Sequence, residues 1–191
     1  FYSDGNQVGD NSNIYMNSSE SGKFYIRYEE GMDQFRYNLK IGSEEKSILI
    51  DSPSPNQWNS VGFVYDGSNI VAYLNGEIVG FVSFSNGGSF YSEAINYIGN
   101  QGWDHGFNGL IDEVRFWSNA LTQEQIQSNM PYEINSDEIG LVSYYKFNAS
   151  SGDILYDHSG NQNHGAIDGA TWVENIEGCM DELACNYNEE A

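Results

Sequence analysis

The sequence predicts an all-β fold, either a sandwich or a barrel. From residue 13 to about 117, short strand-forming runs are separated by turn residues, and almost no segment has a helical period. Asn75-Gly76 lies between two β-rich runs and is the dipeptide that a two-residue hairpin turn favours. Aromatic residues make up 15% of the chain, which distinguishes it from a disordered acidic tail. We therefore expect a folded β domain.

The expected elements follow one another along the chain. Residues 23–30 and 34–42 alternate in side-chain character around a turn and form a hairpin. Thr122 can cap a helix and Gln125 can answer it three residues later, which predicts one short helix over residues 122–129. Further strands are expected at 58–67, 68–84, 94–99, 108–117 and within 139–173.

The charge of the chain narrows its possible partners. With 28 acidic and 7 basic side chains, the formal net charge is −21. A field of that sign repels phosphate backbones and anionic lipids, so we expect neither nucleic-acid binding nor membrane insertion. No run of about 18 apolar residues is present. The acidity favours cations, although it can also serve solubility alone.

Several segments taken together resemble a known family. The runs "WNSVGFVYDGSNIVAYLNGEIVG", "YIGN", "FNGLIDEVRFWSNALTQEQI" and "GLVSYYKFNASSGDILYDHSGNQNHGAIDGATWV" are similar to laminin-G-like domains of the concanavalin A-like lectin/glucanase superfamily. The form they resemble occurs in secreted bacterial proteins, and the resemblance covers residues from about 13 to 173. It implies a two-sheet antiparallel jelly-roll sandwich in an extracellular or cell-surface protein.

The resemblance also sets the expected domain boundaries. Residues 1–173 would form the sandwich, without the strands that begin other family members. Those strands would come from elsewhere in the protein or from another copy by strand addition. Residues 174–191 would be an acidic linker or the start of a separate module.

Two cysteines, Cys179 and Cys185, lie in this last segment. By spacing alone they could close a small loop or remain free thiols. The tail is similar to a Cys- and Asn-containing motif of secreted proteins. That resemblance favours a Cys179–Cys185 bridge, or pairing with a cysteine outside this chain.

Asp112 and Glu113 raise the question of catalysis. By resemblance, hydrolases of the laminarinase type carry acids at alternate positions of one strand, where two carboxylates can flank one glycosidic bond. Here the acids are adjacent, so in a strand they would face opposite sides. We therefore expect no enzyme. Asp112 would point inward, and Glu113 would pair with Arg115 on the other face.

Calcium is the cofactor that the sequence suggests. An inward Asp112 would need backbone donors or a cation, and the resemblance implies that such sandwiches often hold a structural calcium at the sheet rim. The segment "DHSGNQNHG" offers oxygen ligands at alternate positions, without a later bidentate Glu. The alternative is an Asx-rich turn that bonds its own backbone. The candidate metal ligands are Asp112, Asp157, Ser159, Asn161 and Asn163.

The Gly-flanked loop "NQGWDHGF" is the candidate ligand site. Trp103 could stack on a sugar ring while Asp104 and His105 fix its hydroxyls, and Tyr91 could join from a neighbouring loop. Alternatively, Trp103 folds inward and covers the end of the core.

These observations predict a non-catalytic extracellular binding or adhesion module within a longer surface or fibre protein. Its expected partner is a carbohydrate or glycoprotein. The competing hypothesis is a structural subunit of an extracellular filament, which assembles with copies of itself by strand addition and binds no small ligand.

Overall fold

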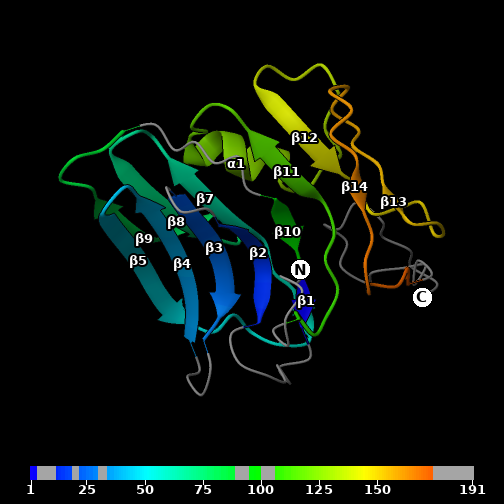
Figure 1. Cartoon of the computed structure of the whole chain (residues 1–191), viewed down its shortest axis with the longest axis horizontal. Coiled ribbons are helices and arrows are strands. Elements are labelled where there is room, and N and C mark those ends of the chain that lie inside the picture. The colour runs from blue at the N-terminus through cyan, green and yellow to red at the C-terminus, as the bar shows by residue number, and fades with distance from the viewer. Residues whose placement is uncertain (4–11, 19–21, 30–33, 89–94, 100–105, 174–191) are drawn as a thin grey trace. The chain divides into compact units, whose positions relative to one another are not determined.

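The computed structural model describes residues 1–3, 12–18, 22–29, 34–88, 95–99 and 106–173. Contacts group the chain into two compact units, Phe1–Ile111 and Asp112–Ala191, and each is described by itself. As expected, antiparallel strands dominate the described part of the chain, together with one short helix (Figure 1). Within the same residues, no helix is long and apolar enough to cross a bilayer.

The first unit is built from ten strands in its described residues. They are β1 (Tyr2–Ser3), β2 (Asn13–Ser18), β3 (Gly22–Tyr28), β4 (Gln34–Ile41), β5 (Glu44–Asp51), β6 (Gln57–Trp58), β7 (Val61–Tyr65), β8 (Asn69–Leu74), β9 (Glu77–Ser83) and β10 (Asn96–Ile98). One sheet has the order β10-β2-β3-β4-β5 and a second the order β7-β8-β9, while β1 pairs with β6. All these pairs are antiparallel.

The core of the first unit lies between the two larger sheets, which stand one behind the other in Figure 1. Alternate residues of β4, namely Phe35, Tyr37 and Leu39, are almost fully buried, as the period of two requires. The Tyr37 hydroxyl donates to the carbonyl oxygen of Tyr73 at 2.8 Å and so joins β4 to β8. This arrangement is a sandwich. The buried cluster comprises Phe1, Ile14, Ile26, Phe35, Tyr37, Leu39, Ile48, Ile70, Ala72 and Phe84.

The hairpin predicted at Asn75-Gly76 is confirmed. Both residues have positive φ, 52° and 78°, and they connect β8 to β9. Only a residue that tolerates the left-handed region fits each of these positions, so the dipeptide determines the turn. The predicted hairpin of residues 23–30 and 34–42 is also confirmed, as β3 and β4.

The second unit contains β11 (Val114–Trp117), α1 (Gln123–Asn129), β12 (Leu141–Tyr145), β13 (Ile154–Leu155) and β14 (Gly165–Ala166). β11 pairs with β12, and β13 pairs with β14. The predicted helix is confirmed together with its capping box, in which Thr122 and Gln125 bond each other's backbone N–H. The division after Ile111 groups residues by contact, so a single sandwich domain over residues 1–173 stays a prediction.

Candidate functional site

The strand predicted over 108–117 is shorter than expected, and this corrects the placement of Asp112. β11 begins only at Val114, and Glu113 has a φ of 54°, in the left-handed region. Strand alternation therefore does not extend through the two acids. Asp112 is exposed rather than inward, and its Oδ1 accepts the backbone N–H of Glu113 at 2.9 Å.

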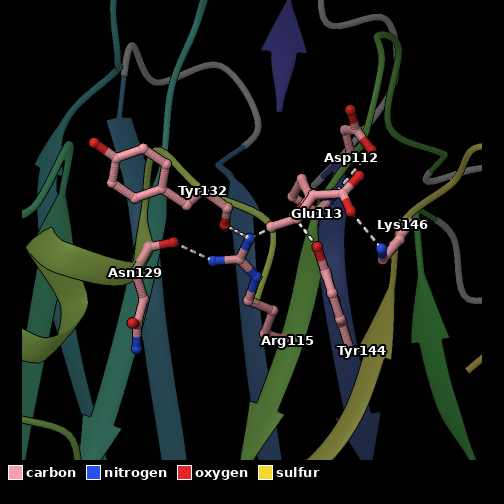
Figure 2. Close-up of polar contacts among 8 residues, drawn as sticks. Asp112, Glu113, Arg115, Asn129, Tyr132, Tyr144 and Lys146 are labelled. Carbon is pink, nitrogen blue, oxygen red and sulfur yellow. Dashed lines mark hydrogen bonds and ion pairs between the residues drawn. The ribbon is translucent and has the colours of Figure 1, made fainter. Parts of the chain in front are cut away.

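Glu113 belongs to a polar network on β11 and β12 (Figure 2). Its Oε2 forms an ion pair with Arg115, as predicted, and accepts the hydroxyl of Tyr144 at 2.6 Å. Arg115 also donates to the carbonyl oxygens of Asn129 at 2.5 Å and Tyr132 at 2.6 Å. One guanidinium thus connects β11 to the end of α1 and to the segment after it. The network therefore joins β11, β12, α1 and the segment that follows α1.

Burial raises the pKa of the Tyr144 hydroxyl well above its usual range, and the hydrogen bond to Glu113 raises it further. The side chain of Tyr144 is inaccessible to solvent. It therefore stays a neutral donor to the carboxylate at any physiological pH. This strengthens the view that Glu113 is a structural acid.

Asp157 lies in an Asx-rich turn whose side chains bond the backbone, which is the arrangement expected if the turn does not bind calcium. Asp157 Oδ1 accepts the backbone N–H groups of Tyr144 and Ser159, each at 2.9 Å. Its Oδ2 accepts the backbone N–H of Asn163 at 2.9 Å and the hydroxyl of Ser159 at 2.8 Å. Burial alone would raise the pKa of Asp157, but these hydrogen bonds outweigh it and lower the pKa.

The other candidate ligands of this turn support β12. Ser159 Oγ, Asn161 Nδ2 and Asn163 Nδ2 all donate to the carbonyl oxygen of Val142, at 3.0, 3.0 and 2.9 Å. Among the described residues, no group of three or more His, Cys, Asp or Glu side chains is arranged to hold a metal ion. The protein's own donors satisfy Asp157 without a cation, and the calcium site stays a prediction.

Several predicted residues lie outside the described part of the chain. These are the ligand-site residues Tyr91, Trp103, Asp104 and His105, and the cysteines Cys179 and Cys185. Their proposed roles stay predictions.

A face that the sequence analysis did not single out lies on the five-stranded sheet. Phe24, Ile26 and Tyr28 of β3 pack against the core, so alternation places Lys23, Tyr25 and Arg27 on the opposite side. On β4, the same reasoning places Arg36, Asn38 and Lys40 on that side. We call this side of the sheet the outer face.

The strand register arranges the outer face in rows. Arg27 lies opposite Arg36, Tyr25 opposite Asn38, and Lys23 opposite Lys40. The central row continues through Met16 to Tyr97 on one side and to Ser47 on the other. Two pairs of like-charged residues therefore flank an uncharged row. The alternation of the two runs indicates which residues share this face, but the pairs themselves depend on the strand register.

Hydrogen bonds and cation–π contacts organise the outer face. The Arg27 guanidinium lies 4.3 Å from the centre of the Tyr25 ring, and Lys23 Nζ lies 4.8 Å from it. Glu29 Oε1 accepts from Nε of both Arg27 and Arg36. Burial raises the pKa of Tyr25, and the two arginines partly offset that rise. The cations thus lie over the tyrosine, and their own side chains are partly exposed.

The two sheets packed around one core define an antiparallel β-sandwich. The chain belongs to the Laminin_G_3 family of the Concanavalin A-like lectin/glucanases superfamily, which matches residues 2–127. The match covers the first unit together with β11 and most of α1, and this confirms the predicted fold and family.

Individual relatives share parts of this sequence or fold. Pappalysin-1 of Mus musculus is 30% identical over 104 residues, which are 51% of this chain and only 6% of that protein. A crystal structure from Bacteroides ovatus ATCC 8483, of a candidate carbohydrate-binding protein, has a TM-score of 0.68 and 23% identity, covering 89% of this chain and 52% of that one. At this identity, the likeness shows the fold alone.

Proposed function

We propose that this chain is a non-catalytic carbohydrate-binding domain and that the outer face of its five-stranded sheet contacts the ligand. The observation that carries the proposal is the chemistry of that face. It presents hydrogen-bonding side chains with an aromatic ring, Tyr97, at the end of the central row. Sugar hydroxyls bind such groups, and sugar C–H faces stack on aromatic rings.

Membership of a lectin and glucanase superfamily supports a carbohydrate ligand. The structurally similar Bacteroides ovatus protein, described as a candidate carbohydrate binder, points the same way. The superfamily includes glucanases, which are hydrolases. None of the described strands carries two carboxylates at alternate positions. That spacing would let one strand aim both acids at one bond.

A glycan array with the full chain tests the proposal. We expect binding to a subset of glycans and no release of reducing sugar from them. Tyr97→Ala should weaken binding about fivefold, because a stacked ring contributes about 1 kcal/mol. Tyr132→Ala removes an exposed tyrosine of the second unit and serves as the control. A folded protein that binds no glycan would overturn the proposal.

The competing class, a filament subunit, predicts polymerisation. β5 is an edge of the described five-stranded sheet and carries Glu44, Glu45, Lys46 and Asp51. Charged residues on an edge strand oppose pairing with another chain. This favours the binding role over strand addition. Light scattering that showed growing polymers together with no glycan binding would favour the filament instead.

We also propose, on the family resemblance, an extracellular location and a structural calcium. Thiol labelling of the native chain before and after reduction tests a bond between Cys179 and Cys185. For calcium, a melting temperature unchanged by EDTA would contradict the proposal.

A further inference from the structure

We infer that the outer face recognises an acidic glycan, one that carries carboxylate or sulfate groups. This inference rests on the proposed function and names the class of its ligand. Positive charge is concentrated on this face. The chain has only seven lysines and arginines, and four of them, Lys23, Arg27, Arg36 and Lys40, share this face. Elsewhere the sequence is overwhelmingly acidic.

The strand register places like charges opposite each other, which lowers the stability of the fold when no ligand is bound. Arg27 faces Arg36 and Lys23 faces Lys40 across the same strand pair. Like charges directly opposite each other destabilise a sheet. Glu29 bridges the two arginines and relieves that pair. Within the described residues, neither Lys23 nor Lys40 forms an ion pair, although Lys40 lies opposite Glu45 on β5. An anionic ligand would neutralise the lysine pair.

The hydrogen-bonding groups of the outer face favour ligand groups that only accept hydrogen bonds. Lysine and arginine side chains donate hydrogen bonds and cannot accept them. A sugar hydroxyl both donates and accepts, whereas a carboxylate or sulfate only accepts and forms shorter, charge-assisted bonds. Because the side chains of Tyr25 and Asn38 are buried beneath this layer, a ligand first meets the cations. The face therefore suits anionic substituents better than neutral sugars.

The spacing of the rows indicates an extended ligand. Lys23 and Arg27 are four residues apart on β3, which separates the two charged rows by about 13 Å. A ligand that touches both rows must carry anionic groups repeated along its length. A single small anion would engage only one row.

The balance of charge favours a glycan over a nucleic acid. Three carboxylates, Glu29, Glu45 and Asp51, lie on or beside the outer face, so its surplus of positive charge is small. Duplex DNA carries one charge per about 1.7 Å, and the −21 chain would repel such a dense polyanion beyond the face. Acidic glycans carry sparser charge than duplex DNA, which suits a face whose positive surplus is small.

The test compares matched ligands and matched variants of the full chain. The ligands are a polyuronate, a sulfated polysaccharide, their carboxyl-reduced and desulfated forms, and duplex DNA. The double variant Lys23→Gln/Lys40→Gln is compared with Lys46→Gln/Lys146→Gln. Both remove two positive charges, but Lys46 pairs with Glu44, Lys146 pairs with Glu133, and neither lysine is one of the four outer-face cations. Melting temperatures confirm folding.

We expect the acidic glycans to bind and their neutralised forms to bind at least tenfold more weakly. The outer-face double variant should lose about tenfold or more in affinity, and the control double variant should keep wild-type affinity. Equal binding of the neutralised forms would overturn this inference and leave the proposed function standing. Binding to no glycan would overturn both. DNA binding as tight as glycan binding would overturn the assignment to a glycan.

Discussion

At the scale of single residues, Asp157 is the best-supported structural acid of the second unit. It is 7% exposed and accepts four hydrogen bonds from the backbone and from a hydroxyl group. These donors lower the pKa of the folded carboxyl below its ordinary value. Its stabilising contribution is therefore present above the unfolded pKa of about 4 and is lost as pH falls through the folded pKa.

Asp157→Asn should lower the free energy of unfolding by about 2 to 4 kcal/mol at pH 7, because a charged acceptor is replaced by an amide. Urea unfolding at several pH values measures this. The gap between wild type and variant should begin to narrow below about pH 4, where the carboxyl of the unfolded wild type becomes protonated, and should keep narrowing until the pH passes the lower folded pKa. The exposed Asp153→Asn should show little effect. A gap that stays constant down to pH 2 would contradict the assignment.

At the scale of elements, the contact of β9 with β5 sets the spacing between the two sheets of the first unit. A Cβ added at Gly80 would lie 2.2 Å from Cγ2 of Ile48. Ile is branched at Cβ and its χ1 is stiff, so Cγ2 cannot easily move aside. Because Gly80 has no side chain, β9 can approach Ile48 of β5 at this point.

Gly80→Ala should destabilise the chain by about 1 to 3 kcal/mol through overpacking. Ile48→Ala alone should also destabilise it, by leaving a cavity. The double variant should lose less than the sum of the two, because the new methyl fills part of that cavity. Chemical unfolding of the wild type, the two single variants and the double variant measures these changes in the free energy of unfolding. Gly88→Ala, where an added Cβ meets nothing within 4 Å, is the control. Additive losses would show that the two sites do not touch.

The helix and the strands show how far local sequence can predict elements. The capping box at Thr122 and the turn at Asn75-Gly76 were predictable, because residues within four positions form them. The strand through Asp112 was predicted wrongly. Glu113 takes up a left-handed backbone beside contacts to Arg115 and to Tyr144, and Tyr144 lies 31 positions away. No local sequence pattern predicts a contact between residues so far apart in the chain.

At the scale of the whole molecule, the net negative charge affects both the stability of the fold and the binding of charged ligands. A surplus of 21 negative charges repels itself and destabilises the folded chain. Salt screens exposed charges, with a Debye length of about 10 Å at 0.1 M and about 3 Å at 1 M. Screening should therefore act in opposite directions on folding and on the binding of an acidic glycan.

Raising NaCl from about 0.05 to about 0.5 M at neutral pH should raise the melting temperature by a few degrees and weaken acidic-glycan binding. Thermal melts and titrations on the same samples measure both. MgCl₂ and CaCl₂ at matched ionic strength separate general screening from a calcium site, since only a specific site distinguishes the two ions. A melting temperature that falls with NaCl would show that ion pairs outweigh the general repulsion.

The sequence by itself determined the all-β class, the main hairpins and the capped helix, because each follows from local periodicity or local hydrogen bonding. It indicated the family through the resemblance of several of its segments to laminin-G-like domains. The tertiary structure alone decided the role of the acids and the composition of the outer face. Asp157 accepts from Tyr144 on β12, and Glu113 pairs with Arg115 on β11 and with Tyr144 on β12. The cations of β3 and β4 form rows only through strand register. Such groupings depend on which distant backbones meet.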